Sequence, residues 1–179
     1  IEVDDTYEVG TSMAEVFGLD DPVIDIALTP NRADCAGVYG IARDLAAAGL
    51  GTLKPLDIVA MNGGFQSSID VRIEDTDGCA QFLGREIKGI KNGASPDWMQ
   101  KQLKAIGLRP ISALVDITNY ITIAHARPLH VYDVAKLNGD IVVASANGGE
   151  SLEALNDKNY TLIADAVTIN DDSGVIGLG

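Results

Sequence analysis

The chain has 179 residues, a mass of 18.8 kDa and a net charge of −13, with 46% hydrophobic and 22% charged residues. This composition is ordinary for a globular protein and excludes wholesale disorder, and the length suits one domain or two small ones. The sequence contains no run of about 18 apolar residues, so it predicts no membrane-spanning helix. The chain begins with Ile and has no signal-peptide pattern, so we expect a piece of a longer, cytoplasmic protein.

The start of the chain is expected to form a small strand-helix module. Ser12 and Glu15 have the spacing of a capping box, which predicts a short helix after Ser12. Residues 23–28 are rich in Val and Ile and predict a strand. Asp34 is a candidate N-cap for a helix that runs to about Ala48, with Gly49 as its stop, because Gly commonly ends a helix.

A second unit is expected after a linker at residues 54–68, where Pro and Gly are frequent and no periodicity is visible. Residues 69–73 alternate apolar and polar side chains, which predicts a half-buried strand, and residues 81–90 predict another. Ser95 is the expected N-cap of a helix that begins with Pro and Asp and stops at Gly107.

The last third of the chain predicts one more helix and several strands. The helix is expected at residues 112–124, and the strands at residues 140–146, 160–163 and 166–169. Asp116 and Asp133 are expected to cap or turn the chain. Because helices and strands are mixed without βαβ regularity, the sequence predicts an α+β fold, with a mixed and antiparallel sheet packed against helices and preceded by the small module.

Positive charge is concentrated in residues 81–127, which carry seven basic and three acidic side chains, a net +4, whereas residues 1–80 and 128–179 carry −11 and −6. Lys101, Lys104 and Arg109 are the candidate contacts to RNA phosphates. A solvated surface with a charge bias would give the same pattern. Trp98 is the only Trp of this segment, so the sequence does not predict a base-stacking platform.

Metal and redox chemistry have little support in the sequence. Cys35 and Cys79 are far apart and are expected to be buried thiols in a reducing compartment. His125 and His130 lack the spacing of a helical zinc pair, so no metal site is predicted. Neither a P-loop, a G-x-G-x-x-G loop nor a G-x-S-x-G elbow occurs.

The best chemical cluster combines Thr118 and Asn119 with His130. Thr118 and Asn119 lie on the helix predicted at residues 112–124, and we expect the turn at Pro128 to fold His130 back beside Asn119. A hydroxyl, an amide and an imidazole together can orient an ester carbonyl, a ribose hydroxyl or a water. The alternative is ordinary helix capping and one surface histidine.

Several motifs resemble, in order, those of the bacterial phenylalanyl-tRNA synthetase β chain. They are TPNRADC (29–35), GIARDL (40–45), GREI (84–87), SPDWM (95–99), GLRPI (107–111), VDITNY (115–120), PLHVYD (128–133) and LIAD (162–165). The resemblance implies a cytoplasmic (αβ)₂ enzyme whose α chain uses ATP and magnesium to charge the phenylalanine tRNA. It also implies a β-chain module that hydrolyses tyrosine mischarged on that tRNA, with no cofactor in this part of the chain.

The resemblance divides the chain into three parts. Residues 1–16 would end an oligonucleotide-binding-type insert, residues 17–60 would form the small module around it, and residues 61–179 would form the editing domain, C-terminally incomplete. In the family the Thr-Asn pair and the His of PLH belong to the editing site. The resemblance therefore implies that Thr118 and Asn119 bind the substrate and act with His130 in catalysis.

The chain departs from the family pattern at two places. His125 and Arg127 stand in the stretch where the family usually has Leu-Gly-Gln, which adds a His and an Arg near the site. The family's tyrosine-recognising acid lies further downstream than residue 179, so we expect this piece to be inactive alone. The alternatives are an inert structural or tRNA-docking scaffold of the β chain and a free-standing RNA-binding relative.

Overall fold

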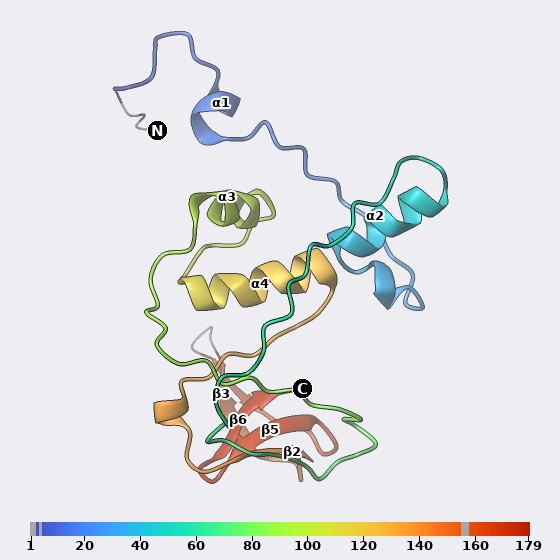
Figure 1. The fold of residues 1–179 in the computed structure, drawn as a ribbon, viewed down its shortest axis with the longest axis vertical. Coiled ribbons are helices and arrows are strands. Elements are labelled where there is room, and N and C mark those ends of the chain that lie inside the picture. Colours follow the sequence, from blue (N-terminus) through green and yellow to red (C-terminus); the bar gives the residue numbers. More distant parts are fainter. Residues whose placement is uncertain (1–2, 4, 155–157) are drawn as a thin grey trace. The chain divides into compact units, whose positions relative to one another are not determined.

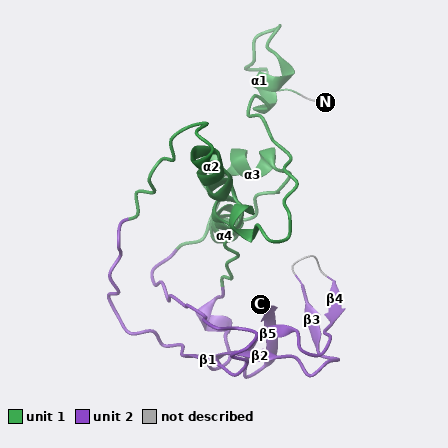
Figure 2. Ribbon diagram, turned by 90° about the vertical axis from the view of Figure 1, so that its right-hand side faces the viewer, with its two compact units in different colours: residues 1–58, 91–131 green, residues 59–90, 132–179 purple. Residues whose placement is uncertain are grey.

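The computed structural model describes residues 3, 5–154 and 158–179. The chain forms two compact units, and each is built from two separate stretches of sequence (Figure 2). Unit 1 comprises residues 1–58 and 91–131 and contains the α-helices, whereas unit 2 comprises residues 59–90 and 132–179 and contains the strands (Figure 1). This confirms the predicted α+β class. None of the helices in the described part of the chain is both long and apolar enough to cross a bilayer.

The first helix, α1 (Met13–Phe17), begins as its capping box predicts. The Ser12 hydroxyl accepts a hydrogen bond from the Glu15 backbone N–H at 3.1 Å, and Gly18 ends the helix in the left-handed conformation. The strand predicted at residues 23–28 is wrong. No strand of the described residues pairs with this segment, and Ile24 is 75% exposed, so its extended, β-branched sequence has no ladder to join.

A short 3₁₀ turn, η1 (Ala33–Cys35), precedes α2 (Val38–Ala47). The predicted cap is wrong, because Gly37 and not Asp34 is the N-cap of α2. Two close approaches require glycine here. A Cβ on Gly40 would lie 2.0 Å from the Asp34 carbonyl oxygen, and a Cβ on Gly37 would lie 2.5 Å from the backbone nitrogen of Ala126. At both glycines, another part of the backbone therefore lies too close to leave room for a Cβ atom.

Helices α3 (Asp97–Ala105) and α4 (Ala113–His125) pack against each other, and α2 packs against α4. The predicted helix at residues 112–124 is confirmed. For α3 the N-cap is Pro96, one residue later than predicted. Ser95 is displaced from the cap because it is buried and its hydroxyl donates to the Asp116 carboxylate.

The Asp116 carboxylate, on the first turn of α4, is the polar centre of unit 1, and Asp116 is only 1% exposed. Besides the bond from Ser95, it accepts one from the Ile111 backbone N–H at 2.8 Å. Burial by itself would raise the pKa of Asp116, but hydrogen bonds from Ser95, Ile111 and Ser112 outweigh it and lower the pKa. One ionised carboxylate thus joins the start of α3, the connecting loop and the start of α4, whereas the N-cap of α4 is Ser112 and not Asp116.

The strands of unit 2 are β1 (Val71–Ile73), β2 (Ile141–Ser145), β3 (Ser151–Glu153), β4 (Asn159–Thr161), β5 (Val167–Asp171) and β6 (Gly174–Leu178). They form a four-stranded sheet in the order β1-β2-β5-β6 and a separate hairpin, β3-β4. The β1 strand is parallel to β2, whereas β2-β5 and β5-β6 are antiparallel. A parallel pair needs a long crossover, and here the chain between β1 and β2 builds α3 and α4 in unit 1.

The centre of the sheet is buried at Val143, Thr168 and Ile169. The Thr168 hydroxyl donates to the carbonyl of Ala144 at 2.8 Å, so its polar atom is satisfied inside the sheet. Before the sheet, the Asp133 carboxylate accepts from the Ala135 backbone N–H and caps the 3₁₀ turn η2 (Val134–Lys136), as expected.

The strand predicted at residues 81–90 is wrong. Side-chain hydrogen bonds of Glu86, rather than a strand ladder, attach this segment to residues 67–68. The Glu86 carboxylate accepts hydrogen bonds from the Ser68 backbone N–H at 2.7 Å and from the Ser67 and Ser68 hydroxyls. The first of these bonds, with help from the hydroxyls and Lys88, lowers the pKa of Glu86 to about 2. The segment 54–68 contains neither helix nor strand, as predicted for a linker, and Glu86 fixes its last residues.

Replacing Asp116 should destabilise unit 1. The Asp116→Asn change leaves buried N–H and hydroxyl donors without an ionised acceptor, and we expect a loss of roughly 2 kcal/mol or more in urea unfolding followed by Trp98 fluorescence. Because folding lowers this pKa, the carboxylate stabilises fully above its ordinary value of 3.8 and loses its effect as the pH falls below it. The difference in the free energy of unfolding between the wild-type chain and the Asp116→Asn variant should therefore become smaller in acid. Asp57→Asn, at an exposed site, is the control, and equal stability of the Asp116 variant at neutral pH would contradict the assignment.

Candidate functional site

Helix α4 carries the pair of residues that sequence analysis singled out. Thr118 and Asn119 lie midway along the helix and are half-buried. The Thr118 hydroxyl donates to the carbonyl of Val115 at 2.7 Å, so its oxygen remains available as an acceptor. Among the described residues, none makes a hydrogen bond to the side-chain amide of Asn119. The pair therefore offers one acceptor and one unused amide next to each other on a fixed helix.

His130 lies beyond the helix, on an exposed segment of the same unit. Helix α4 ends at His125, Ala126 takes the left-handed conformation, and Pro128 prevents the helix from resuming. The exit at this point agrees with the expected turn. The approach of His130 to Asn119 stays a prediction.

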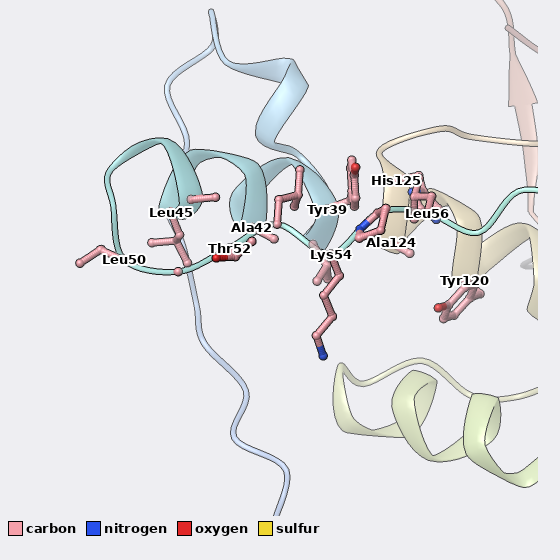
Figure 3. Close-up of a pocket in the computed structure, with 15 residues that line it drawn as sticks. Tyr39, Ala42, Leu45, Leu50, Thr52, Lys54, Leu56, Tyr120, Ala124 and His125 are labelled. Atoms are coloured by element: carbon pink, nitrogen blue, oxygen red, sulfur yellow. The ribbon is translucent and has the colours of Figure 1, made fainter.

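The two residues by which the sequence departs from the family pattern have separate surroundings. The His125 ring lies 5.8 Å from the Tyr39 ring, centroid to centroid, so it packs on α2. These rings border an open apolar groove of about 490 Å³ between α2, the segment 50–56 and the end of α4 (Figure 3). Arg127 is exposed on the turn.

The three predicted RNA-contacting cations are all exposed: Lys101 and Lys104 lie on α3, and Arg109 follows it. Since each helical residue turns by about 100°, Lys101 and Lys104 lie about 60° apart around α3, with Trp98 about 60° further on. Trp98 also meets Tyr120 of α4, with ring centroids 5.4 Å apart and ring planes at 87°. Sequence reasoning missed this pair, because no local spacing connects residues 22 positions apart.

A cluster near the start of α2 has the composition of a metal site, but its carboxylates and thiol bind an arginine side chain of the same chain. One ligand atom each from Asp34, Cys35 and Asp44 lies within 4.8 Å of the others. The Arg32 guanidinium donates to all three: to Asp34 at 3.0 Å, to the Cys35 sulfur at 2.7 Å and to Asp44 at 2.5 Å. Arg43 donates to Asp34 as well. Two guanidinium groups thus balance two carboxylates, and we interpret the cluster as a structural ion-pair network that holds residues 32–35 against α2.

The architecture so far defines an α+β protein with a helical unit that presents a Thr-Asn pair and a cationic, aromatic helix face. Comparison with protein families matches residues 78–179 to the B3/4 domain, and the chain belongs to this family. Three similar curated proteins are named phenylalanine–tRNA ligase beta subunit. They come from Novosphingobium aromaticivorans (51% identical over 99% of this chain), Rhodopseudomonas palustris (53% over 99%) and Brucella abortus (52% over 97%). The chain spans only 22–23% of the length of these relatives.

The two cysteines should differ in reactivity. Cys35 is buried, burial raises the pKa of its thiol, and the hydrogen bond to Asp44 raises it further, whereas Cys79 is half-buried. Because the thiolate is the reacting form, iodoacetamide at neutral pH should label Cys79 about tenfold faster or more, as read by peptide mass spectrometry. In denaturant the two rates should converge. Equal labelling of the folded chain would show that the Arg32 cluster is open to solvent.

Proposed function

We propose that this chain is part of a phenylalanyl-tRNA synthetase β chain and contributes the site that hydrolyses tyrosine mischarged on the phenylalanine tRNA. Its similarity to phenylalanine–tRNA ligase beta subunits supports membership of that enzyme. The observation that carries the editing assignment is the half-buried Asn119 amide, without a partner among the described residues, beside the Thr118 hydroxyl on α4.

The need for such a site follows from the physics of selection. A hydrophobic pocket built for phenylalanine cannot strongly reject an analogue that merely adds a hydroxyl, so some tyrosine is charged. A second pocket that hydrogen-bonds the phenol favours tyrosine, because phenylalanine there would leave buried polar groups unpaired. Hydrolysis at the second pocket then removes the error.

The three site residues would divide the chemistry. Asn119 and Thr118 would orient the terminal ribose or the aminoacyl carbonyl, with the amide as donor and the hydroxyl oxygen as acceptor. His130 would position the water that attacks the ester carbon, or a tRNA hydroxyl that assists it. The ester bond breaks, the ribose oxygen takes up a proton, and tyrosine and uncharged tRNA are released. Because no full catalytic dyad is present in this set, positioning supplies more of the rate than proton transfer does.

The exposed cations would hold the RNA. Lys101, Lys104 and Arg109 lie on or just after α3, which packs against the helix that carries Thr118 and Asn119. Lysine and arginine contacts to phosphates release counterions and bring the tRNA end to the site. This arrangement also favours a second candidate function, a tRNA-docking scaffold without chemistry, which the His130 experiment below separates from editing.

The remaining partners belong to the whole enzyme. The relatives are beta subunits, so the partner of the complete chain would be an α chain in an (αβ)₂ assembly in the cytoplasm. ATP and magnesium would serve the ligation on the α chain, and we assign no cofactor or metal to the residues described here.

The first functional prediction concerns His130. In the complete β chain assembled with its α chain, His130→Ala should slow tyrosyl-tRNA hydrolysis by roughly 10²-fold, because the positioned imidazole is lost. Phenylalanine charging should stay unchanged, since that chemistry belongs to the α chain. His125→Ala is the matched control, because His125 packs on Tyr39. Unchanged hydrolysis by the His130 variant would leave the docking scaffold as the function of this site.

The second concerns the cations. A triple variant in which Lys101, Lys104 and Arg109 are each replaced by Ala should bind tRNA more weakly. The slope of log affinity against log salt should become shallower by up to about three, roughly one for each cation lost. The matched control replaces Lys54, Arg72 and Lys136, three basic residues outside the positive segment. An identical slope for both triple variants would show that the positive segment is only a solvated surface.

A further inference from the structure

Trp98 is the only tryptophan of the chain, and it lies at the surface with 51% of its area exposed. The buried face of α3 is formed by Met99 and Leu103, which are 6% and 2% exposed. Counting about 100° per residue, Trp98 lies roughly 100° from Met99 and 140° from Leu103, so it stands at the edge of the face that packs. About half of this large aromatic residue is therefore exposed to water, although Met99 and Leu103 already anchor the helix.

Tyr120 fixes the orientation of this ring. The two ring planes are nearly perpendicular, at 87°, with centroids 5.4 Å apart, a favourable edge-to-face geometry. Such a contact covers one edge or one face of the indole, and about half of the residue, 51%, stays exposed to solvent. Tyr120 directly follows Asn119 on α4, which connects the open ring to the proposed editing residues.

The charges around Trp98 favour a polyanion. Lys104, Lys101 and Trp98 follow one another around α3 in steps of about 60°, so they share one face of the helix. Asp97 is the only acidic residue of α3 and lies in its first turn, where it complements the helix dipole. Two exposed lysines next to an open aromatic face are unusual in a chain whose net charge is −13.

We propose that Trp98 stacks on one unpaired base of single-stranded RNA, while Lys101 and Lys104, which both follow Trp98 along α3, contact neighbouring phosphates of the same strand. Stacking on an indole needs a base that is not enclosed in a duplex, and cations beside an aromatic ring are the usual elements of single-strand binding. This rests on the proposed function in one respect: the RNA is the unpaired, aminoacylated end of the tRNA. A single ring stacks on one base. The proposed stacking site therefore does not require the platform of several aromatic rings that the sequence fails to predict.

The single tryptophan makes the test direct. We would titrate the chain with a short single-stranded RNA that ends in CCA, with the same oligonucleotide lacking its bases, and with a fully paired RNA duplex, and follow Trp98 fluorescence. Stacking predicts saturable quenching by the single strand, and little by the abasic strand or the duplex at equal phosphate concentration.

Variants separate stacking from charge. Trp98→Ala should lower affinity for labelled single-stranded RNA roughly five- to hundredfold, while the salt slope stays the same because no cation is lost. Trp98→Phe should restore part of the affinity, and it also guards against misfolding of the Ala variant. Lys101→Ala should reduce the slope and leave the quenching at saturation intact.

The outcomes distinguish this inference from the function on which it rests. RNA binding without base-dependent quenching, or equal quenching by the abasic strand, would overturn the stacking site and leave RNA binding in place. Absence of any RNA binding would overturn both. Base-dependent quenching in an enzyme whose hydrolysis is indifferent to His130→Ala would support stacking and overturn editing.

Discussion

The buried carboxylate of Asp116 is the constraint on which the helical unit depends. A charge that is 1% exposed is tolerated only if several hydrogen bonds compensate its lost hydration, and the Ser95 hydroxyl with the Ile111 and Ser112 backbone N–H groups provides them. Those donors come from the residue before the N-cap of α3, from the connecting loop and from the start of α4. Satisfying one carboxylate therefore sets the positions of both helices.

Further contacts along α4 position α2 and orient the Trp98 ring of α3. At the far end of α4, the close approach of Gly37 to Ala126 places α2, and near the middle Tyr120 orients the Trp98 ring from α3. Thr118 and Asn119 lie between Asp116 and Tyr120, on a helix held at both ends. A site that works by positioning a substrate needs such rigid support, because small displacements of a bound group reduce rate strongly.

The sequence could predict those elements that are determined by neighbouring residues in the chain. The capping box at Ser12 and the α4 helix are confirmed, since caps and periodicity act within a few residues. The strands expected at residues 23–28 and 81–90 are absent from the described structure, because apolar β-branched sequence favours extended backbone but cannot provide a partner strand. Strand β6 (Gly174–Leu178) was missed for the opposite reason: its glycines lower strand propensity, and pairing with β5 overrides it. Likewise, the Thr118–Asn119 pair was visible as neighbours in the chain, whereas the contact between Trp98 and Tyr120 is tertiary.

Hydrogen–deuterium exchange tests most directly whether the α3–α4 surface receives the aminoacylated end of a tRNA. The probe is tRNA that carries tyrosine through a non-hydrolysable amide, bound to the complete β chain with its α chain. We expect slower amide exchange in residues 95–125 with the tyrosylated tRNA than with uncharged tRNA, because only the tyrosylated form would fill the proposed site next to Asn119. Equal exchange of these residues in both complexes and in the free enzyme would contradict it.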